Sequence, residues 1–393
     1  MKVLMINAVC GTGSTGRICT DLAHILEEQG HTVKIAYGRQ AAPKQFDRYG
    51  VRIGSDLGVR INGVLTRLLD NEGFNAYFAT KKFLRWVEEF DPDIVHLHNL
   101  HGYYLHIGLL FDYLKRANKK VIWTLHDCWA FTGHCAYFSA AGCDKWQSQC
   151  YGCPQKRAYP RSILMSRAKK NFQKKQKLFT GIKDLTLVTP SQWLADRVKE
   201  SFLKEYAVYP IPNGINLELF CPTENNLREE YGLKNKKILL GVASVWDERK
   251  GLNVFVRLSQ LLPESYKIVL IGLAEAQQQA MPKEILCFSR TNSIRQLAQW
   301  YTTADVFINP SVEETMGMTT AEALACGTPV ITYNKTAVPE VADDTCGISV
   351  ECTPEAIVSA LSQLSFTKEA CLKRAEAYEQ NQQYAQYLKL YQM

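Results

Sequence analysis

The chain has 393 residues, of which 46% are hydrophobic and 22% charged, and its net charge is +7. This length predicts two domains of about 200 residues each, and the composition excludes a disordered or fibrous chain. No apolar run reaches the ~18 residues that span a bilayer. The apolar N-terminus continues directly into glycines, so it predicts a strand and not a signal peptide. We therefore expect a cytoplasmic protein with mostly reduced cysteines.

The first 38 residues predict a strand, a glycine loop, a helix and a second strand, which together form a βαβ unit. The loop reads GTGSTG and contains Gly13 and Ser14, and Arg17 stands at the start of the helix. Such a loop lets a phosphate or sugar approach the backbone closely. No acidic residue follows the second strand, which argues against a dehydrogenase. Residues 39–75 are polar and break the pattern, so we expect a mobile connection.

Four of the eight histidines lie at two predicted strand ends, residues 96–101 and 126–129. Ligands bind beyond the carboxyl ends of the strands in an open parallel sheet. His126, which Asp127 follows, is therefore a candidate functional residue. The alternative is a structural imidazole held by hydrogen bonds.

An insertion after the second of these strand ends contains four cysteines with the spacing C-x7-C-x6-C-x2-C. These are Cys135, Cys143, Cys150 and Cys153. Four thiolates in a reducing compartment suit a tetrahedral zinc site, whose role would be structural because no ligand position stays open for substrate. Disulfides and plain buried thiols are the alternatives.

Residues 157–183 contain nine Lys or Arg residues and no Asp or Glu. A basic tract of this kind docks on anionic lipid headgroups or binds nucleic acid, and its alternative is a solvated helix face. Phe172, Leu178 and Phe179 supply apolar anchors for either case.

The second half begins after the turn residues at 210–214, and its alternating strands and helices predict a second parallel sheet. Its first strand leads into Arg249 and Lys250. A later strand leads into the stretch NPSVEETMGMTTAEALACGTPVIT at 309–332. Here Glu314 and Glu322 flank a glycine turn at a helix start, where backbone N–H groups attract anions and carboxylates suit hydroxyl-rich ligands. The alternative is a surface glutamate and a glutamate that merely favours the helix dipole.

Several of these segments together resemble one known family. The glycine loop, TLHD, SQWLAD, NGIN, the Lys-Gly pair at 250–251 and the E-x7-E pattern resemble the GT-B glycosyltransferases of family 4 over essentially the whole chain. The cysteine insertion resembles a subgroup of bacterial capsule and exopolysaccharide clusters. The resemblance implies an α/β fold with two Rossmann-like domains that face each other across a cleft. Residues 1–210 would form the acceptor side, with 374–393 packing back on it, and residues 211–373 would bind the nucleotide sugar.

The resemblance also implies an activity, namely retaining transfer of a hexose from a nucleotide-diphosphate sugar to a glycan or a polyprenol-linked saccharide in cell-surface polysaccharide synthesis. By position, Glu314 would contact the donor sugar, Glu322 the ribose, and Lys250 the diphosphate leaving group. The backbone at Gly317, Met318 and Thr319 would hold the sugar and phosphates. His126 would approach the sugar from the first domain.

One position departs from the family pattern: the usual Arg five residues before the Lys is Val245 here. Arg249 can replace its charge, since a guanidinium grips phosphate oxygens at two points. These cations stabilise the leaving group electrostatically, so no catalytic metal is required, and the sequence has no D-x-D pair to hold one. We expect a protein at the inner face of the plasma membrane that binds no nucleic acid. The competing hypotheses are a nucleotide-sugar epimerase of the same architecture and a non-enzymatic sugar- or nucleic-acid-binding protein.

Overall fold

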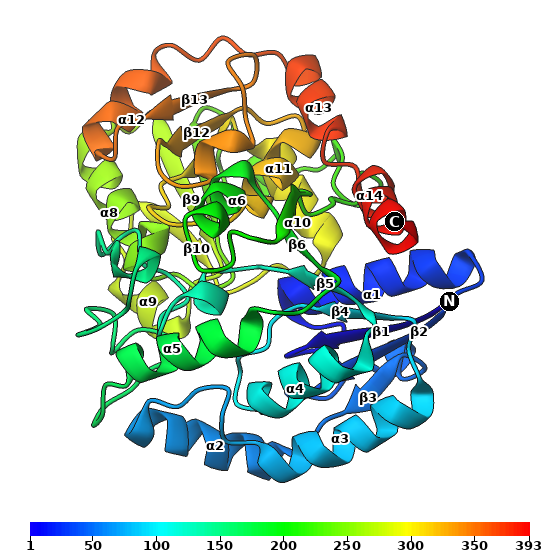
Figure 1. The fold of residues 1–393 in the computed structure, drawn as a ribbon. Coiled ribbons are helices and arrows are strands. Elements are labelled where there is room, and N and C mark those ends of the chain that lie inside the picture. The colour runs from blue at the N-terminus through cyan, green and yellow to red at the C-terminus, as the bar shows by residue number, and fades with distance from the viewer. The chain divides into compact units, whose positions relative to one another are not determined.

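The computed structural model describes residues 1–393, which form two compact units. The first unit contains Met1–Ile211 together with Tyr384–Met393, and the second contains Pro212–Gln383. Each unit is built on a parallel sheet with helical crossovers, as Figure 1 shows, so the predicted α/β class is confirmed. No helix combines the length and the apolar character needed to cross a bilayer.

The first unit has a seven-stranded sheet in the order β3-β2-β1-β4-β5-β6-β7. Its strands are β1 (Lys2–Asn7), β2 (Thr32–Tyr37), β3 (Gly50–Arg52), β4 (Ile94–Leu97), β5 (Lys120–Thr124), β6 (Leu185–Thr189) and β7 (Ala207–Pro210). The central strands are buried along almost their whole length, as is typical of a parallel sheet that helices cover on both faces.

The helices of the first unit are α1 (Gly13–Glu28), α2 (Asp56–Leu69), α3 (Tyr77–Phe90), α4 (Ile107–Ala117), α5 (Ala168–Phe179) and α6 (Gln192–Lys199), with short 3-10 turns at Lys44–Phe46, Trp129–Phe131 and Lys145–Gln147. The last helix, α14 (Gln380–Gln392), enters this unit from Tyr384 onward. Its buried Tyr387 and Tyr391 join the core beside β1 and β5. The hydroxyl of Tyr391 lies 2.6 Å from Nδ1 of His96, so the chain end is bonded into the sheet.

The prediction of a mobile connection at residues 39–75 is wrong, because this segment holds β3 and the 14-residue helix α2. The Ser55 hydroxyl caps α2 by accepting from the amide of Gly58. The helix buries Gly63 and Thr66. Its two buried positions are thus small or polar, and Val59 packs against the core while only partly buried, which explains why a search for an inward apolar stripe passes over the helix.

The later part of the basic tract forms α5, whose two phenylalanines point into the core. Phe172 and Phe179 are 2% and 0% exposed, so they do not serve as anchors for an outside partner. Lys175 is buried as well. Its ammonium donates to the carbonyls of Trp129 and Thr132, at 2.7 and 3.1 Å, and burial lowers its pKa to about 7. One of the nine cations therefore holds the loop after β5 in place.

The second unit has a six-stranded sheet in the order β10-β9-β8-β11-β12-β13. The strands are β8 (Lys237–Val242), β9 (Tyr266–Ile271), β10 (Ile285–Phe288), β11 (Val306–Asn309), β12 (Val330–Tyr333) and β13 (Gly347–Val350). The helices are α7 (Leu227–Glu230), α8 (Leu252–Leu261), α9 (Glu275–Ala280), α10 (Ile294–Thr303), α11 (Met318–Ala325), α12 (Pro354–Leu361) and α13 (Lys368–Glu376), with 3-10 turns η4 (Glu248–Lys250) and η5 (Val338–Glu340). The helix α13 packs on α11 within this unit.

Candidate active site

In the sheet of the second unit, the strand order reverses between β8 and β11. From β8 the chain adds β9 and β10 on one side, and then β11 to β13 on the other. A crevice opens at such a switch point beyond the carboxyl ends of the strands, and it is where open α/β sheets bind their ligands. The loop with Lys250 follows β8 and the loop with Glu314 follows β11. Both predicted residues therefore stand at the switch point.

The two loops are held together by backbone contacts. The amide of Val312 donates to the carbonyl of Arg249 at 3.0 Å. Gly251 has a φ of +74°, and a Cβ at this position would lie 2.7 Å from the carbonyl oxygen of Pro310. Only glycine combines this left-handed conformation with so close an approach. The turn at Gly251 thus places Lys250 next to the loop after β11, and this turn requires glycine at position 251.

Lys250 and Glu314 form an ion pair at the centre of this site. The ammonium lies 2.8 Å from Oε1 of Glu314, and the two side chains are 23% and 9% exposed. Asn309 at the end of β11 donates to the same oxygen at 3.4 Å, and the amide of Glu314 donates to the Thr336 hydroxyl at 3.0 Å. The carboxylate is therefore fixed in position, while the cation keeps access to solvent.

The turn between the two glutamates leads into α11. Gly317 is the N-cap residue, and its carbonyl accepts from the amides of Thr320 and Ala321. A Cβ on Gly317 would lie 2.9 Å from the Thr320 hydroxyl, so this position has no room for a side chain. Met318 and Thr319 form the first turn of α11 and are half-buried. A helix start of this kind directs backbone N–H groups and the positive end of the dipole toward an anion.

Glu322 lies further along α11 and is held by α10. The buried hydroxyl of Tyr301 donates to Oε2 of Glu322 at 2.8 Å. Burial, and next the Glu322 carboxylate, raise the pKa of Tyr301 well above its usual value, so the phenol stays protonated and remains a donor. No sequence pattern predicts this bond, because the two residues are 21 positions apart and lie on different helices.

Arg249 points toward the backbone of the same region. Its guanidinium donates to the carbonyl of Glu313 at 3.0 Å and lies 3.5 Å from Oδ2 of Asp247. The side chain of Val245, where the family pattern has Arg, is 67% exposed. The structure thus places a second cation beside Lys250 from the adjacent position.

In the first unit, His126 follows β5 and belongs to a row of histidines. Its Nε2 lies 3.0 Å from Nδ1 of His98, and the His98 ring lies against that of His96. Burial lowers the pKa of His126 to about 4 and that of His96 to about 3. These imidazoles are therefore uncharged at neutral pH.

Asp127, next to His126 in sequence, pairs with a different histidine. Its Oδ2 lies 2.7 Å from Nε2 of His101, and its Oδ1 accepts from the amide of Trp129. Burial alone would raise the pKa of Asp127, but the contact with His101, the amide of Trp129 and the nearby His126 together outweigh it, so the pKa lies below its usual value. His101 and Asp127 are thus a buried pair that sequence reasoning missed.

The predicted glycine loop opens α1 at the same edge of the first unit's sheet. Gly13 has a φ of +63°, and Gly13, Ser14 and Arg17 are exposed. Asn7 at the end of β1 connects this loop to the next strand: its amide nitrogen donates to the carbonyl of Val9, and its oxygen accepts from the amide of Asn99. These residues lie in the first unit, whereas Lys250, Glu314 and Glu322 lie in the second.

The prediction of a structural zinc site is not supported. The four cysteines Cys135, Cys143, Cys150 and Cys153 line one cavity of about 10 Å³, but no group of three or more His, Cys, Asp or Glu side chains is arranged to hold a metal ion. All thirteen cysteines are free thiols. The sulfurs instead make separate hydrogen bonds: Cys135 contacts Cys153, and Cys150 accepts from the amide of Gly133 at 3.2 Å. The cluster consists of free thiols, which are buried at Cys135 and Cys150 and half-buried at Cys143 and Cys153.

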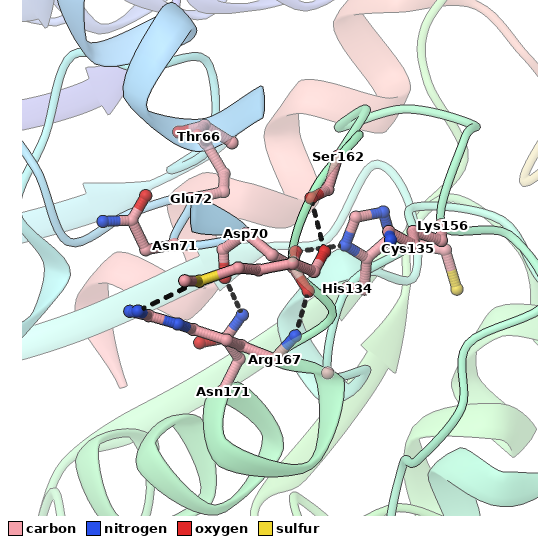
Figure 2. A network of polar contacts seen from close by, with 12 residues as sticks. Thr66, Asp70, Asn71, Glu72, His134, Cys135, Lys156, Ser162, Arg167 and Asn171 are labelled. Atoms are coloured by element: carbon pink, nitrogen blue, oxygen red, sulfur yellow. Dashed lines mark hydrogen bonds and ion pairs between the residues drawn. The ribbon is translucent and has the colours of Figure 1, made fainter. Parts of the chain in front are cut away.

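A polar network beside the cysteines was also missed (Figure 2). The carboxylate of Asp70, at the end of α2, lies 2.5 Å from Nδ1 of His134 and accepts from the amide of Arg167. Its carbonyl accepts from the side chain of Asn171 on α5 at 2.7 Å. Asp70 therefore fastens α2, the cysteine insertion and α5 to one another.

The comparisons with known proteins agree with this fold. Residues 15–219 match Glycosyltransferase Family 4, and residues 236–365 match Glycosyl transferases group 1. Because the first match covers half of the chain, the protein belongs to glycosyltransferase family 4. Its two parallel-sheet units are those of the GT-B architecture.

Individual relatives match smaller parts. The chain is 26% identical over 208 residues to WcaC of Escherichia coli K12, which is named as a colanic acid biosynthesis glycosyl transferase. The aligned residues cover 50% of each chain. It is 28% identical over 167 residues to the alpha-galactosylglucosyldiacylglycerol synthase of Streptococcus pneumoniae R6, covering 39% of this chain and 44% of that one. The chain thus spans about half the length of these relatives or less. Among solved structures, Anabaena HepE in complex with UDP-glucose superposes with a TM-score of 0.65 at 15% identity, over 99% of both chains.

Proposed function

We propose that this glycosyltransferase moves a hexose, with retention of anomeric configuration, from a nucleoside diphosphate sugar to a saccharide acceptor in cell-surface polysaccharide synthesis. The observation that carries the proposal is the pair of Lys250 and Glu314, 2.8 Å apart at the switch point of the second unit. The names of the relatives support polysaccharide or glycolipid synthesis as the setting, and the complex of HepE supports a nucleotide sugar as donor.

The chemistry assigns a role to each charge. Breaking the bond between the sugar carbon and the diphosphate leaves positive charge on the sugar and negative charge on the departing oxygen. Lys250, assisted by Arg249, stabilises that negative charge, as preorganised cations do at a developing anion. Glu314 holds hydroxyl groups of the donor sugar, and Glu322 holds the ribose. The acceptor oxygen bonds to the sugar carbon as the bond to the diphosphate breaks, and the acceptor proton passes to an oxygen of the departing diphosphate.

The turn before α11 completes the donor site in this proposal. The backbone at Gly317, Met318 and Thr319 receives the phosphates and the sugar, because the start of α11 attracts anions. With two cations and a helix start available for the leaving group, catalysis does not depend on a divalent metal. The donor-binding role of Gly13, Ser14 and Arg17 is a further proposal, which their exposed glycine loop supports.

The first unit holds the acceptor in this proposal, and His126 approaches the reacting sugar as a neutral imidazole. A neutral ring suits this role, since it can bind a hydroxyl group without adding charge near the sugar carbon. The acceptor is a glycan or a polyprenol-linked saccharide. The cations of residues 157–183 support a place at the anionic inner face of the plasma membrane.

The test is a transfer assay with UDP-, GDP- and ADP-sugars and a membrane extract as the source of acceptor. We expect one donor class to release its nucleoside diphosphate only when acceptor is present, and NMR of the product to show the anomeric configuration of the donor. Stoichiometric conversion of the nucleotide sugar into an epimer without acceptor would contradict the transferase proposal. An inverted product would contradict retention alone.

A further inference from the structure

The outer face of α2 carries a stripe of large apolar side chains. Leu57, Ile61, Val64 and Leu68 are 68%, 51%, 52% and 38% exposed. They recur at spacings of four, three and four residues, so they share one face of the helix. A surface helix ordinarily turns such a stripe toward the core. Here it faces solvent.

The orientation of α2 is fixed by its opposite, polar face. Asn62 donates to the carbonyl of Tyr103 at 2.9 Å. Asn75 donates to the hydroxyl of Thr66 at 3.2 Å, and that hydroxyl in turn donates to the buried Glu72. Gly63 is buried between these contacts. If α2 were rotated so that its apolar stripe faced inward, these hydrogen bonds would break. The apolar side chains would then lie against the polar groups that now bond to Asn62 and Thr66.

A second segment extends the apolar face. The amides of Ile163 and Met165 donate to the carbonyls of Arg67 and Leu68, at 2.7 and 3.2 Å, so residues 163–165 run beside the end of α2. The side chains of Ile163, Leu164 and Met165 are 53%, 68% and 45% exposed. Together with the stripe they form one continuous surface, which we call the α2 apolar surface: Leu57, Ile61, Val64, Leu68, Ile163, Leu164 and Met165.

Cations border this surface. Arg60 and Arg67 stand on one flank of α2 and are exposed. The ammonium of Lys156 donates to the carbonyl of Leu164, and the guanidinium of Arg167 lies 3.4 Å from the sulfur of Met165. Figure 2 shows Lys156 and Arg167 on the segment that runs past the end of α2.

Acidic groups around the surface are already engaged. Residues 57–69 contain no Asp or Glu. Asp56 pairs with Arg52 at the start of α2. Asp70 bonds to His134, and Glu72 accepts from the amides of Gly102 and Tyr103. The α2 apolar surface is therefore bordered by cations whose charge no carboxylate of this region offsets.

We propose that the α2 apolar surface docks on an anionic lipid bilayer, with α2 lying in the plane of the headgroups. An apolar stripe that enters the acyl boundary and cations that meet lipid phosphates are the two components of interfacial helix binding. A second copy of the chain fits less well, because it would bring a second row of arginines against the first. The proposal deepens the proposed attachment to the membrane and does not depend on sugar transfer.

The surface also resolves a difficulty with the basic tract. Phe172 and Phe179 of α5 are in the core, so the α5 part of the tract can attract lipid headgroups but cannot insert. The α2 apolar surface supplies the insertion, and the exposed cations of residues 157–183 supply long-range attraction.

The test is flotation of the full-length protein with vesicles of phosphatidylcholine that contain 30% phosphatidylglycerol, without any nucleotide sugar. We compare Ile61→Asn and the double variant Ile61→Asn/Val64→Asn with Leu219→Asn, a matched change at a side chain that is 47% exposed in the second unit. We expect the double variant to bind at least tenfold more weakly, and Leu219→Asn to bind like the wild type, with unchanged melting temperatures. Arg60→Gln/Arg67→Gln should weaken binding to these vesicles and reduce its dependence on salt.

Three results would overturn the proposal. The first is a wild type that does not float with the anionic vesicles, and the second is a double variant that floats as well as the wild type. The third is a dimer in sedimentation velocity that Ile61→Asn dissociates, because the surface would then be an interface between copies. Since the assay uses no donor or acceptor, its failure leaves the proposed reaction untouched, and failure of the transfer assay leaves lipid binding untouched.

Discussion

The carboxyl edges of the two sheets share a topology and differ in charge. In the second unit, the edge carries a cation and a carboxylate in contact, Lys250 and Glu314, on loops that the backbone locks together. In the first unit, the edge carries a row of histidines that burial keeps uncharged. This difference fits the proposal that the second unit stabilises the charged leaving group. At the edge of the first unit, the neutral imidazoles lie beside the buried pair of Asp127 and His101, and in the proposal this unit holds the acceptor.

The largest expected effect comes from removing the cation of the second unit. We expect Lys250→Ala to lower the rate of transfer by about a hundredfold or more, because a preorganised charge at the leaving group is lost. The matched control is Arg257→Ala, which removes an exposed cation of α8 that pairs loosely with Glu355. If Lys250→Ala turned over about as fast as Arg257→Ala, Lys250 would not be the catalytic cation.

A smaller effect is expected at Glu322. Changing it to Gln removes the charge from a proposed ribose contact, so we expect the KM for the donor to rise about tenfold with little change in kcat. Tyr301→Phe, which removes only the phenol that holds Glu322, should raise the KM less and lower stability by about 1 kcal/mol. Steady-state kinetics on both variants provide the check. A kcat loss without a KM change in Glu322→Gln would contradict the ribose assignment.

The histidine row predicts how stability depends on pH. The pKa of His126 is about 4 in the folded chain and lies below the ordinary value of 6.5, so the unfolded chain binds more protons between these two values. Stability is therefore fully present above pH 6.5 and falls as the pH drops toward 4. Urea unfolding followed by tryptophan fluorescence measures the slope of the unfolding free energy against pH. This slope reports how many more protons the unfolded chain binds, and His126→Asn should reduce that number by up to one. An equal slope in the variant would contradict the burial argument.

The smallest effect concerns the thiol pair. The hydrogen bond from Cys135 lowers the pKa of Cys153 to about 6. We expect Cys135→Ala to raise this pKa toward its ordinary value, whereas Cys221→Ala should leave it unchanged. Iodoacetamide labelling across a pH series, read at Cys153 by mass spectrometry, follows the change. A midpoint that stays near pH 6 in Cys135→Ala would show that the hydrogen bond is not its cause.

The site of the second unit was predictable because its signals are local. Lys250 and Glu314 each follow a buried apolar strand, and parallel strands bring such ends to one edge of a sheet. The bond between Tyr301 and Glu322 was not predictable, since it joins two helices whose packing no short motif encodes. Asp127 follows His126 in sequence, yet successive side chains at a strand end point in different directions, and Asp127 pairs with His101 instead.

Two other expectations failed for related reasons. Cysteine spacing reports how close the chain segments come and not where the sulfurs point, so it suggested a zinc site that the side chains do not form. The helix α2 was missed because its large apolar stripe faces outward, while its buried positions are Gly63 and Thr66 and its apolar contact with the core comes from the partly buried Val59. A periodicity search that assumes an inward apolar face assigns the wrong face to such a helix.

The most direct test of the proposed donor site is the affinity of the protein for a nucleoside diphosphate sugar and for the bare nucleoside diphosphate, measured by isothermal titration calorimetry. The wild type, Glu314→Gln and Lys250→Ala are compared with both ligands. If Glu314 holds the sugar and Lys250 the diphosphate, Glu314→Gln weakens only the sugar-bearing ligand and Lys250→Ala weakens both. Equal affinities of all three proteins for both ligands would contradict the assignment of this pair to the donor.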